Sequence, residues 1–200
     1  MVKMKDLNYS LIESTAPAFE PITLAEARDQ ASVDSDVDDA LINSYIKAAR
    51  IYATNINGRG MARATYTLTA PRFPTEFILP RPPFSTVTSI KYYDTNGTQQ
   101  TLADTVYSVD TGSEPGRVVL AYNQSWPTIR DVYNAVQVVY VSGYASAAAV
   151  PENFKQAMRM LIAHWFEYRE PIIVGGAVSN VPLSVETLLM TDRLNAYGMV

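Results

Sequence analysis

Apolar residues recur at every third or fourth position in two long stretches of the chain, which is the spacing of an amphipathic helix. The first stripe consists of Val37, Leu41, Tyr45, Ala48, Tyr52 and Ile56, and Gly58 follows it as the expected C-cap. The second stripe consists of Phe154, Met158, Leu161, Ile162, Trp165 and Tyr168, and it ends before Pro171. Each stripe predicts a long helix.

Capping residues add two shorter helices and mark where the first long helix begins. Thr23-Leu-Ala-Glu26 forms a capping box, which predicts a helix to about Ala31. Asp34 and Asp36 offer cap oxygens for the first long helix, and the two aspartates that follow suit its first turn. Ser184 is the expected cap of a last helix that runs to Leu194.

Between the long helices the sequence changes to short runs rich in β-branched and aromatic residues, separated by Pro, Gly, Asn and Asp. The predicted strands are Ala64–Ala70, Glu76–Leu79, Thr86–Tyr93, Val106–Asp110, Arg117–Tyr122 and Ala135–Val141. Asn96-Gly97 is typical of a tight hairpin turn. Parallel pairing needs long crossover connections, and these connections are short, so the strands are expected to pair antiparallel.

Together these elements predict an α+β protein, with a helical bundle, an inserted small antiparallel β-sheet and a flexible C-terminal arm. The expected organisation is an extended N-terminal arm over residues 1–21, a single domain over 22–170 and a C-terminal arm with a short helix over 171–200. Within the domain the helices occupy 23–58 and 151–169, and the β-rich insertion occupies 64–141.

Composition excludes most catalytic classes. The sequence has no cysteine and a single histidine, which removes thiol catalysis, disulfides, iron–sulfur clusters and most zinc sites. His164 has no evident nucleophilic partner, and the aspartates at 34, 36, 38 and 39 lack the glycine and glutamate of a calcium loop. We therefore expect no catalytic residue, no metal and no cofactor. We also find no signal peptide and no stretch of 18 apolar residues, so we expect synthesis in the cytoplasm.

Charge usage points to protein partners. Only 18% of the residues are charged and the net charge is -4, which argues against general binding of nucleic acid. Protein interfaces are poor in Lys, Glu and Asp and rich in aromatic residues and Met, and this chain has 13 Tyr and 7 Met. Either a large core or extensive burial in an assembly explains this composition.

Two segments stand out as candidate contacts. Leu79-Pro-Arg-Pro-Pro-Phe84 is stiff because of its prolines, and it is interpreted either as a rigid turn or as an interface to which Arg81 and Phe84 contribute. Trp126 ends a strand-like run, where a tryptophan is more often a hydrophobic lid than an interface residue. Both readings stay open for each segment.

Several short motifs occur in a characteristic order over residues 17–194. They are Glu20-Pro-Ile-Thr-Leu-Ala-Glu-Ala27, Leu79-Pro-Arg-Pro-Pro83, Val87-Thr-Ser-Ile90, Pro115-Gly-Arg117, Gly143-Tyr144, Val150-Pro151 through Ala163-His-Trp165, and Glu170-Pro-Ile-Ile-Val-Gly175. In this order and spacing the chain resembles the head-to-tail connector proteins of tailed bacteriophages, the adaptor or head completion proteins also found in prophages and gene transfer agents.

The resemblance implies a non-enzymatic structural protein of the virion neck that forms a ring, usually of twelve copies, beneath the portal protein. Such a ring extends the DNA channel and provides the docking site for the stopper or tail, and DNA passes through it without tight binding. Residues 40–56 and 151–169 would be ring helices, and 172–200 would be the portal-binding arm. The candidate interface residues are Arg81, Phe84, Trp126, Ile172, Ile173, Val174, Leu188, Leu189 and Arg193.

Two alternatives remain at this point. A stopper or tail terminator would share the low charge but would normally be dominated by β-structure. A small cell-wall-acting enzyme would need a carboxylate in a cleft or a zinc site.

An acidic channel lining is a further hypothesis, for which Asp104, Asp110 and Glu114 are as suitable as the aspartates at 34–39.

Overall fold

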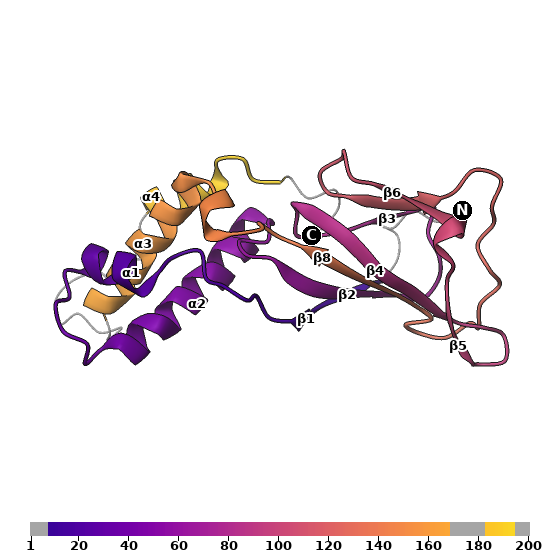
Figure 1. Cartoon of the computed structure of the whole chain (residues 1–200), viewed down its shortest axis with the longest axis horizontal. Helices are drawn as coiled ribbons and strands as arrows, with labels where there is room; N and C mark the ends of the chain where they lie inside the picture. The colour runs from indigo at the N-terminus through magenta and orange to yellow at the C-terminus, as the bar shows by residue number, and fades with distance from the viewer. Residues whose placement is uncertain (1–7, 169–182, 195–200) are drawn as a thin grey trace. The chain divides into compact units, whose positions relative to one another are not determined.

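The computed structural model describes residues 8–168 and 183–194, which belong to two compact units (Figure 1). The helical unit contains residues 19–62, 144–168 and 183–194. The β unit contains residues 8–18 and 63–143. The predicted β-rich insertion is therefore a unit with its own core, and it also recruits part of the predicted N-terminal arm.

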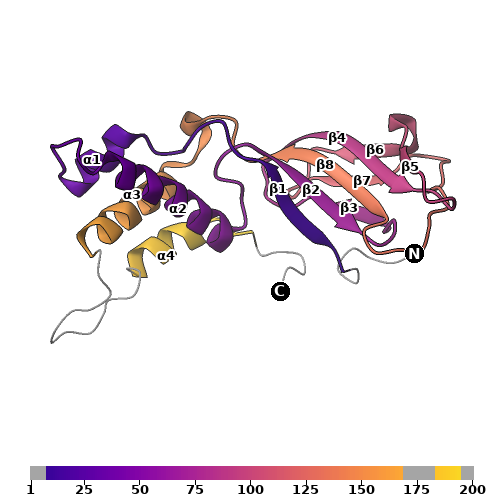
Figure 2. The same ribbon diagram turned by 90° about the horizontal axis from the view of Figure 1, so that it is seen from below.

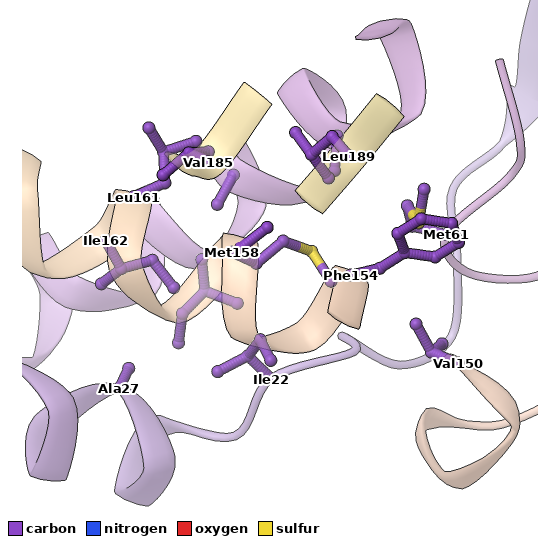
Figure 3. Packing of buried hydrophobic residues seen from close by; sticks show 14 of the residues in the cluster. Ile22, Ala27, Met61, Val150, Phe154, Met158, Leu161, Ile162, Val185 and Leu189 are labelled. Atoms are coloured by element: carbon purple, nitrogen blue, oxygen red, sulfur yellow. The ribbon is translucent and has the colours of Figure 1, made fainter. Parts of the chain in front are cut away.

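The helical unit consists of four helices around one apolar core. They are α1 (Leu24–Ala31), α2 (Asp39–Asn57), α3 (Glu152–Glu167) and α4 (Leu183–Met190). Figure 3 shows Met158, Leu161 and Ile162 of α3 lying between Val185 and Leu189 of α4 on one side and Ile22 and Ala27 on the other. The described helices and sheets confirm the α+β class.

The buried face of α2 is displaced by one position from the predicted stripe. Ile42, Ile46, Ala49 and Ala53 are buried, whereas the predicted Val37 is 85% exposed and precedes the helix. Small alanines allow close approach to neighbouring helices, and the larger predicted residues Tyr45, Tyr52 and Ile56 pack at the edge of the core. The helix begins at Asp39, and its N-cap is Asp38, whose side chain makes no capping hydrogen bond. The predicted caps Asp34 and Asp36 both precede it.

The β unit contains two antiparallel sheets. The strands are β1 (Ser10–Thr15), β2 (Ala64–Ala70), β3 (Glu76–Ile78), β4 (Phe84–Tyr93), β5 (Gln99–Thr101), β6 (Tyr107–Asp110), β7 (Arg117–Leu120) and β8 (Val136–Ser142). Five strands form one sheet in the order β1-β2-β8-β4-β5, and three form the other in the order β3-β7-β6 (Figure 2). Antiparallel pairing is confirmed throughout these sheets, but a single small sheet was predicted and two are present.

The core of the β unit is filled from both sheets. Leu68, Ile90 and Val138 of the five-stranded sheet are fully buried, as are Phe77 and Val118 of the three-stranded sheet. Along β8, and along β2 except at the buried Thr67, buried residues alternate with more exposed ones, which is the pattern of a sheet with one face on the core.

Strand β1 lies within the segment predicted as an extended arm. It pairs with β2, with Leu11 opposite Leu68 and Ile12 opposite Thr67. The strand has only six residues and few apolar ones, so its sequence carries little alternation. Pairing with β2, whose own alternating pattern is clear, explains why it is a strand.

Helix α4 lies within the predicted C-terminal arm, but it packs on the helical core. Val185 and Leu189 are 0% and 1% exposed. Residues 171–182 of that predicted arm lie outside the described residues. The short helix that the sequence predicted is thus present and is part of the helical unit.

The capping box at the start of α1 gives a test of the helical unit. Glu26 N donates to Thr23 Oγ1 at 3.2 Å, and Thr23 N donates to Glu26 Oε2 at 2.8 Å. We expect Thr23→Ala to lower the free energy of unfolding by about 1 kcal/mol, measured by urea denaturation. No change in that free energy would contradict the capping role.

The same box predicts a pH dependence. The hydrogen bond from Thr23 N is the main cause that holds the pKa of Glu26 below its ordinary value. Because this pKa is lowered in the folded state, the stabilisation is complete above the ordinary carboxyl pKa and is lost as the pH falls through the lowered value. Glu26→Gln should keep the cap and lose this part of the acid sensitivity. An unchanged pH profile would contradict the assignment.

Candidate functional site

Charged and titratable side chains that the sequence singled out have structural roles here. In the described part of the chain, no group of three or more His, Asp or Glu residues is placed to hold a metal ion. Asp39 forms an ion pair with Arg28, and His164 is half-buried with its ring centroid 5.1 Å from that of Tyr168. No helix in residues 8–168 and 183–194 is both long and apolar enough to span a membrane.

The proline-rich segment before β4 is fastened to β8. Tyr140 Oη donates to Pro80 O at 3.0 Å, Ser142 Oγ donates to Pro83 O at 3.1 Å, and Gly143 N donates to Pro83 O at 2.8 Å. Burial raises the pKa of Tyr140 well above its ordinary value, so its phenol stays protonated as a donor. These contacts support the interpretation of this segment as a rigid turn.

Arg81 is half-buried in that turn and has a left-handed backbone with φ of 66°. Its positive charge lies close enough to Tyr9 and Tyr140 to oppose the rise in pKa that burial causes in each phenol. Non-glycine residues with positive φ are uncommon and are held by their surroundings. Arg81 therefore acts within the β unit, and its role at an interface stays a prediction.

Phe84 begins β4 and packs on Gly116, which immediately precedes β7. An added Cβ at Gly116 would lie 2.7 Å from Phe84 Cγ. The ring is half-buried and contacts the core of the β unit. The described contacts of Phe84 therefore join the two sheets.

Trp126 closes an aromatic cluster in the connection between β7 and β8. Its ring stacks on Phe73 with centroids 4.7 Å apart and planes 4° apart, and its Nε1 donates to Pro74 O at 3.1 Å. Phe73 in turn contacts Phe77 and Tyr92, one from each sheet. This geometry agrees with the lid interpretation, because both the ring face and the polar nitrogen have partners in the β unit.

Three of the remaining candidate interface residues lie on or just after α4. Leu189 is buried in the core, Leu188 is half-buried against it, and Arg193 is exposed after the helix ends. Ile172, Ile173 and Val174 lie outside the described residues. The role of this set at an interface therefore stays a prediction.

Polar anchors of α4 escaped the sequence analysis. Asn57 Nδ2 donates to Leu189 O at 2.7 Å, and Arg59 Nε donates to Asp192 O at 3.3 Å. A guanidinium nitrogen of Arg59 also lies 3.2 Å from Asp192 Oδ2. Carbonyls at a helix C-terminus need such donors. Asn57 continues the buried row of Ala49 and Ala53, and because the predicted stripe lay one position away, the sequence carried no signal for this anchor.

Charged residues on α1 and α3 form a surface cluster. Arg159 pairs with Glu152 and lies 3.7 Å from Glu26, and Lys155 lies 2.7 Å from Glu152. Asp29 lines the same open depression as Arg159. Exposed ion pairs of this kind contribute little to stability, and nothing in this one selects a ligand.

Substitution of Gly116 tests the contact with Phe84. We expect Gly116→Ala to destabilise the β unit by about 1–3 kcal/mol, because the new methyl group overlaps a packed ring. Gly112→Ala is the matched control, since the nearest atom to its Cβ is Asp110 Oδ1 at 3.6 Å. Equal unfolding free energies for the two variants, measured by thermal denaturation, would contradict the close packing.

Substitution of Asn57 tests the anchoring of α4. Asn57→Ala removes the donor to Leu189 O in a buried site, and we expect a loss of about 1–3 kcal/mol. Amide hydrogen exchange in residues 183–190 should accelerate. Asn43→Ala is the control on the same helix, because Asn43 Nδ2 donates within that helix to Asp39 O at 2.9 Å. Unchanged exchange in Asn57→Ala would show that the anchor is not needed.

The chain is similar to a known protein family and to solved structures. A family model described as "Head completion protein" matches residues 20–181. A chain from the neck of an empty GTA (gene transfer agent) particle, computed with C6 symmetry, has 25% identity and a TM-score of 0.72, and the match covers 92% of this chain and 95% of that one. None of the curated protein sequences matches the chain.

Two further solved structures are similar. One is a virion of a native gene transfer agent particle, with a TM-score of 0.71, and the other is the neck of a native particle computed with C12 symmetry, with a TM-score of 0.68. Both chains have 25% identity, and each match covers 92% of this chain and 94% of the other. The resemblance seen in the sequence is confirmed. With the family model matching most of its length, the chain belongs to the head completion protein family.

Proposed function

We propose that this head completion protein is a ring subunit of a particle neck, placed beneath the portal protein. The observation that carries the proposal is its likeness to chains in necks computed with C6 and C12 symmetry. The matches cover more than nine-tenths of each chain, so they include both the helical and the β unit. A subunit repeated about an axis forms a closed ring.

Within this ring, α2 and α3 would form the body as part of a helical bundle, and the β unit would meet the stopper or tail. The C-terminal segment would bind the portal. Helix α4 lies in this segment, but its inner face packs on the core and is not available to the portal. Its Leu183 and Met190 are 78% and 48% exposed and support a contact on the outer face. The portal contact would then use the outer face of an anchored helix.

We infer that the protein is not an enzyme and that DNA passes through the ring without being held. The net charge of -4 supports the second part of this inference, because tight binding of DNA requires positive charges that neutralise phosphates. Of the acidic residues considered for the channel lining, Asp110 already accepts hydrogen bonds from Gly112 N at 2.9 Å and Ser113 N at 3.2 Å. Its carboxylate is therefore needed in a turn. A channel lining by Asp104, Glu114 or the aspartates at 34–39 stays a prediction.

Sedimentation velocity of the full-length chain, alone and with its portal protein, tests the proposal. We expect one or both samples to contain a ring-sized species. Leu183→Glu should weaken joining to the portal about tenfold or more, because it places a charge in an apolar contact. Truncation before α4 would be a poorer test, since it removes Val185 and Leu189 from the core.

Val37→Glu is the matched control, because Val37 is also a highly exposed apolar residue but precedes α2. It should join the portal as the wild type does. A chain that stays monomeric and ignores the portal would contradict the ring proposal. Normal joining by Leu183→Glu would contradict only the assignment to α4.

A further inference from the structure

The outward-facing side of the five-stranded sheet is almost free of charge. Its central row consists of Ile12, Thr67, Val139 and Ser89, which are paired across β1, β2, β8 and β4. Thr67 is only 5% exposed, and its hydroxyl donates to Ser14 Oγ of β1. The flanking rows consist of Thr65, Val141 and Thr86 on one side and Thr69, Gln137 and Lys91 on the other. We call these ten residues the neutral face. Lys91 is its one charged residue.

The other sheet of the same unit provides an internal comparison. On its outward-facing side, Glu76 is paired with Val119, and Arg117 is paired with Asp110. An Arg117 guanidinium nitrogen lies 3.1 Å from Glu76 Oε2. That side has charged residues and an ion pair, as an ordinary solvated surface does. The lack of charge on the neutral face is therefore a property of that face and not of the β unit as a whole.

Among the described residues, the neutral face continues to an edge of the sheet. Strand β1 is an outer strand of the sheet, and Ile12 on it is 57% exposed. The one charged residue of β1 is Glu13, which is paired with the buried Tyr66 and so belongs to the row opposite the neutral face. An exposed apolar side chain that continues an uncharged face is typical of a surface that becomes covered on assembly.

We propose that the neutral face is the contact through which each copy of this chain packs against its neighbour in the ring, an inference that rests on the proposed function. A ring requires every copy to offer two different surfaces to identical neighbours. A neutral surface suits this contact, because burying it leaves no charge unpaired. DNA does not fit it, since a single lysine gives little neutralisation of phosphates.

The absence of cysteine from the sequence makes a sharp test available. Thr86→Cys places one thiol on the neutral face, and Ser108→Cys places one on the outward side of the other sheet as a matched control. Both positions are exposed strand residues. Each variant would replace the wild-type chain in cells that assemble particles, and the rate of thiol reaction with a maleimide would be compared between purified particles and the free chain.

We expect the Thr86→Cys thiol to react about tenfold more slowly or less in particles, because a packed contact excludes solvent, and the Ser108→Cys thiol to change less than about twofold. A benzophenone-maleimide attached at the Thr86→Cys position and irradiated in particles should yield a cross-linked dimer of this chain. Mass spectrometry of the cross-linked peptides identifies both partners.

The other outcomes distinguish a wrong assignment of the neutral face from a wrong ring proposal. If the chain is present in particles but the Thr86→Cys thiol reacts at the rate of the free chain, the neutral face is not buried, and this inference is wrong while the ring proposal stands. Cross-linking to a different protein would also overturn it. Absence of the wild-type chain from particles would overturn the proposed function, and this inference with it.

Discussion

Pairing of β2 with β8 is the contact on which the rest of the structure depends. Ala64 lies opposite Ser142, so the two ends of the inserted β unit leave the sheet side by side. Immediately beyond them, Tyr144 N donates to Gly60 O at 3.0 Å within the helical unit. The segments that lead to α2 and α3 are therefore held together although the whole insertion separates them in the sequence. This reduces the entropy lost when α2 and α3 form their core. Loss of this pairing would disturb both cores at once.

Elements with a strong pattern of their own were predictable from the sequence. The capping box at Thr23 and the alternation along β2 and β8 come from residues close together in the chain. Strand β1 and the buried face of α2 were not, because distant partners decide them: β1 is a strand through its pairing with β2, and alanines rather than tyrosines line the inner face of α2. Helix α4 was predicted, but its packing on the core was not, because the segment is short and weakly patterned. Its two buried residues and the hydrogen bond from Asn57 hold it there.

The candidate interface residues show the same limit. Arg81, Phe84 and Trp126 were notable in the sequence because prolines and aromatic residues surround them, and in the structure each has contacts inside the β unit. A stiff segment and an interface segment have similar composition, so only spatial neighbours distinguish them. The neutral face was missed for the opposite reason. Its threonines and valines are ordinary strand residues, and their common lack of charge appears only when the register places them on one side of the sheet.

These features describe a structural subunit with two small, well-anchored cores and a surface low in charge. Such a chain suits repeated contacts with protein neighbours better than the binding of a charged ligand. The most direct measurement is a cryo-electron microscopy map of the neck of particles that contain this chain. The account predicts density for repeated copies of the helical and β units around the channel axis, below the portal. A neck made of other folds, with this chain elsewhere in the particle or absent from it, would contradict the account.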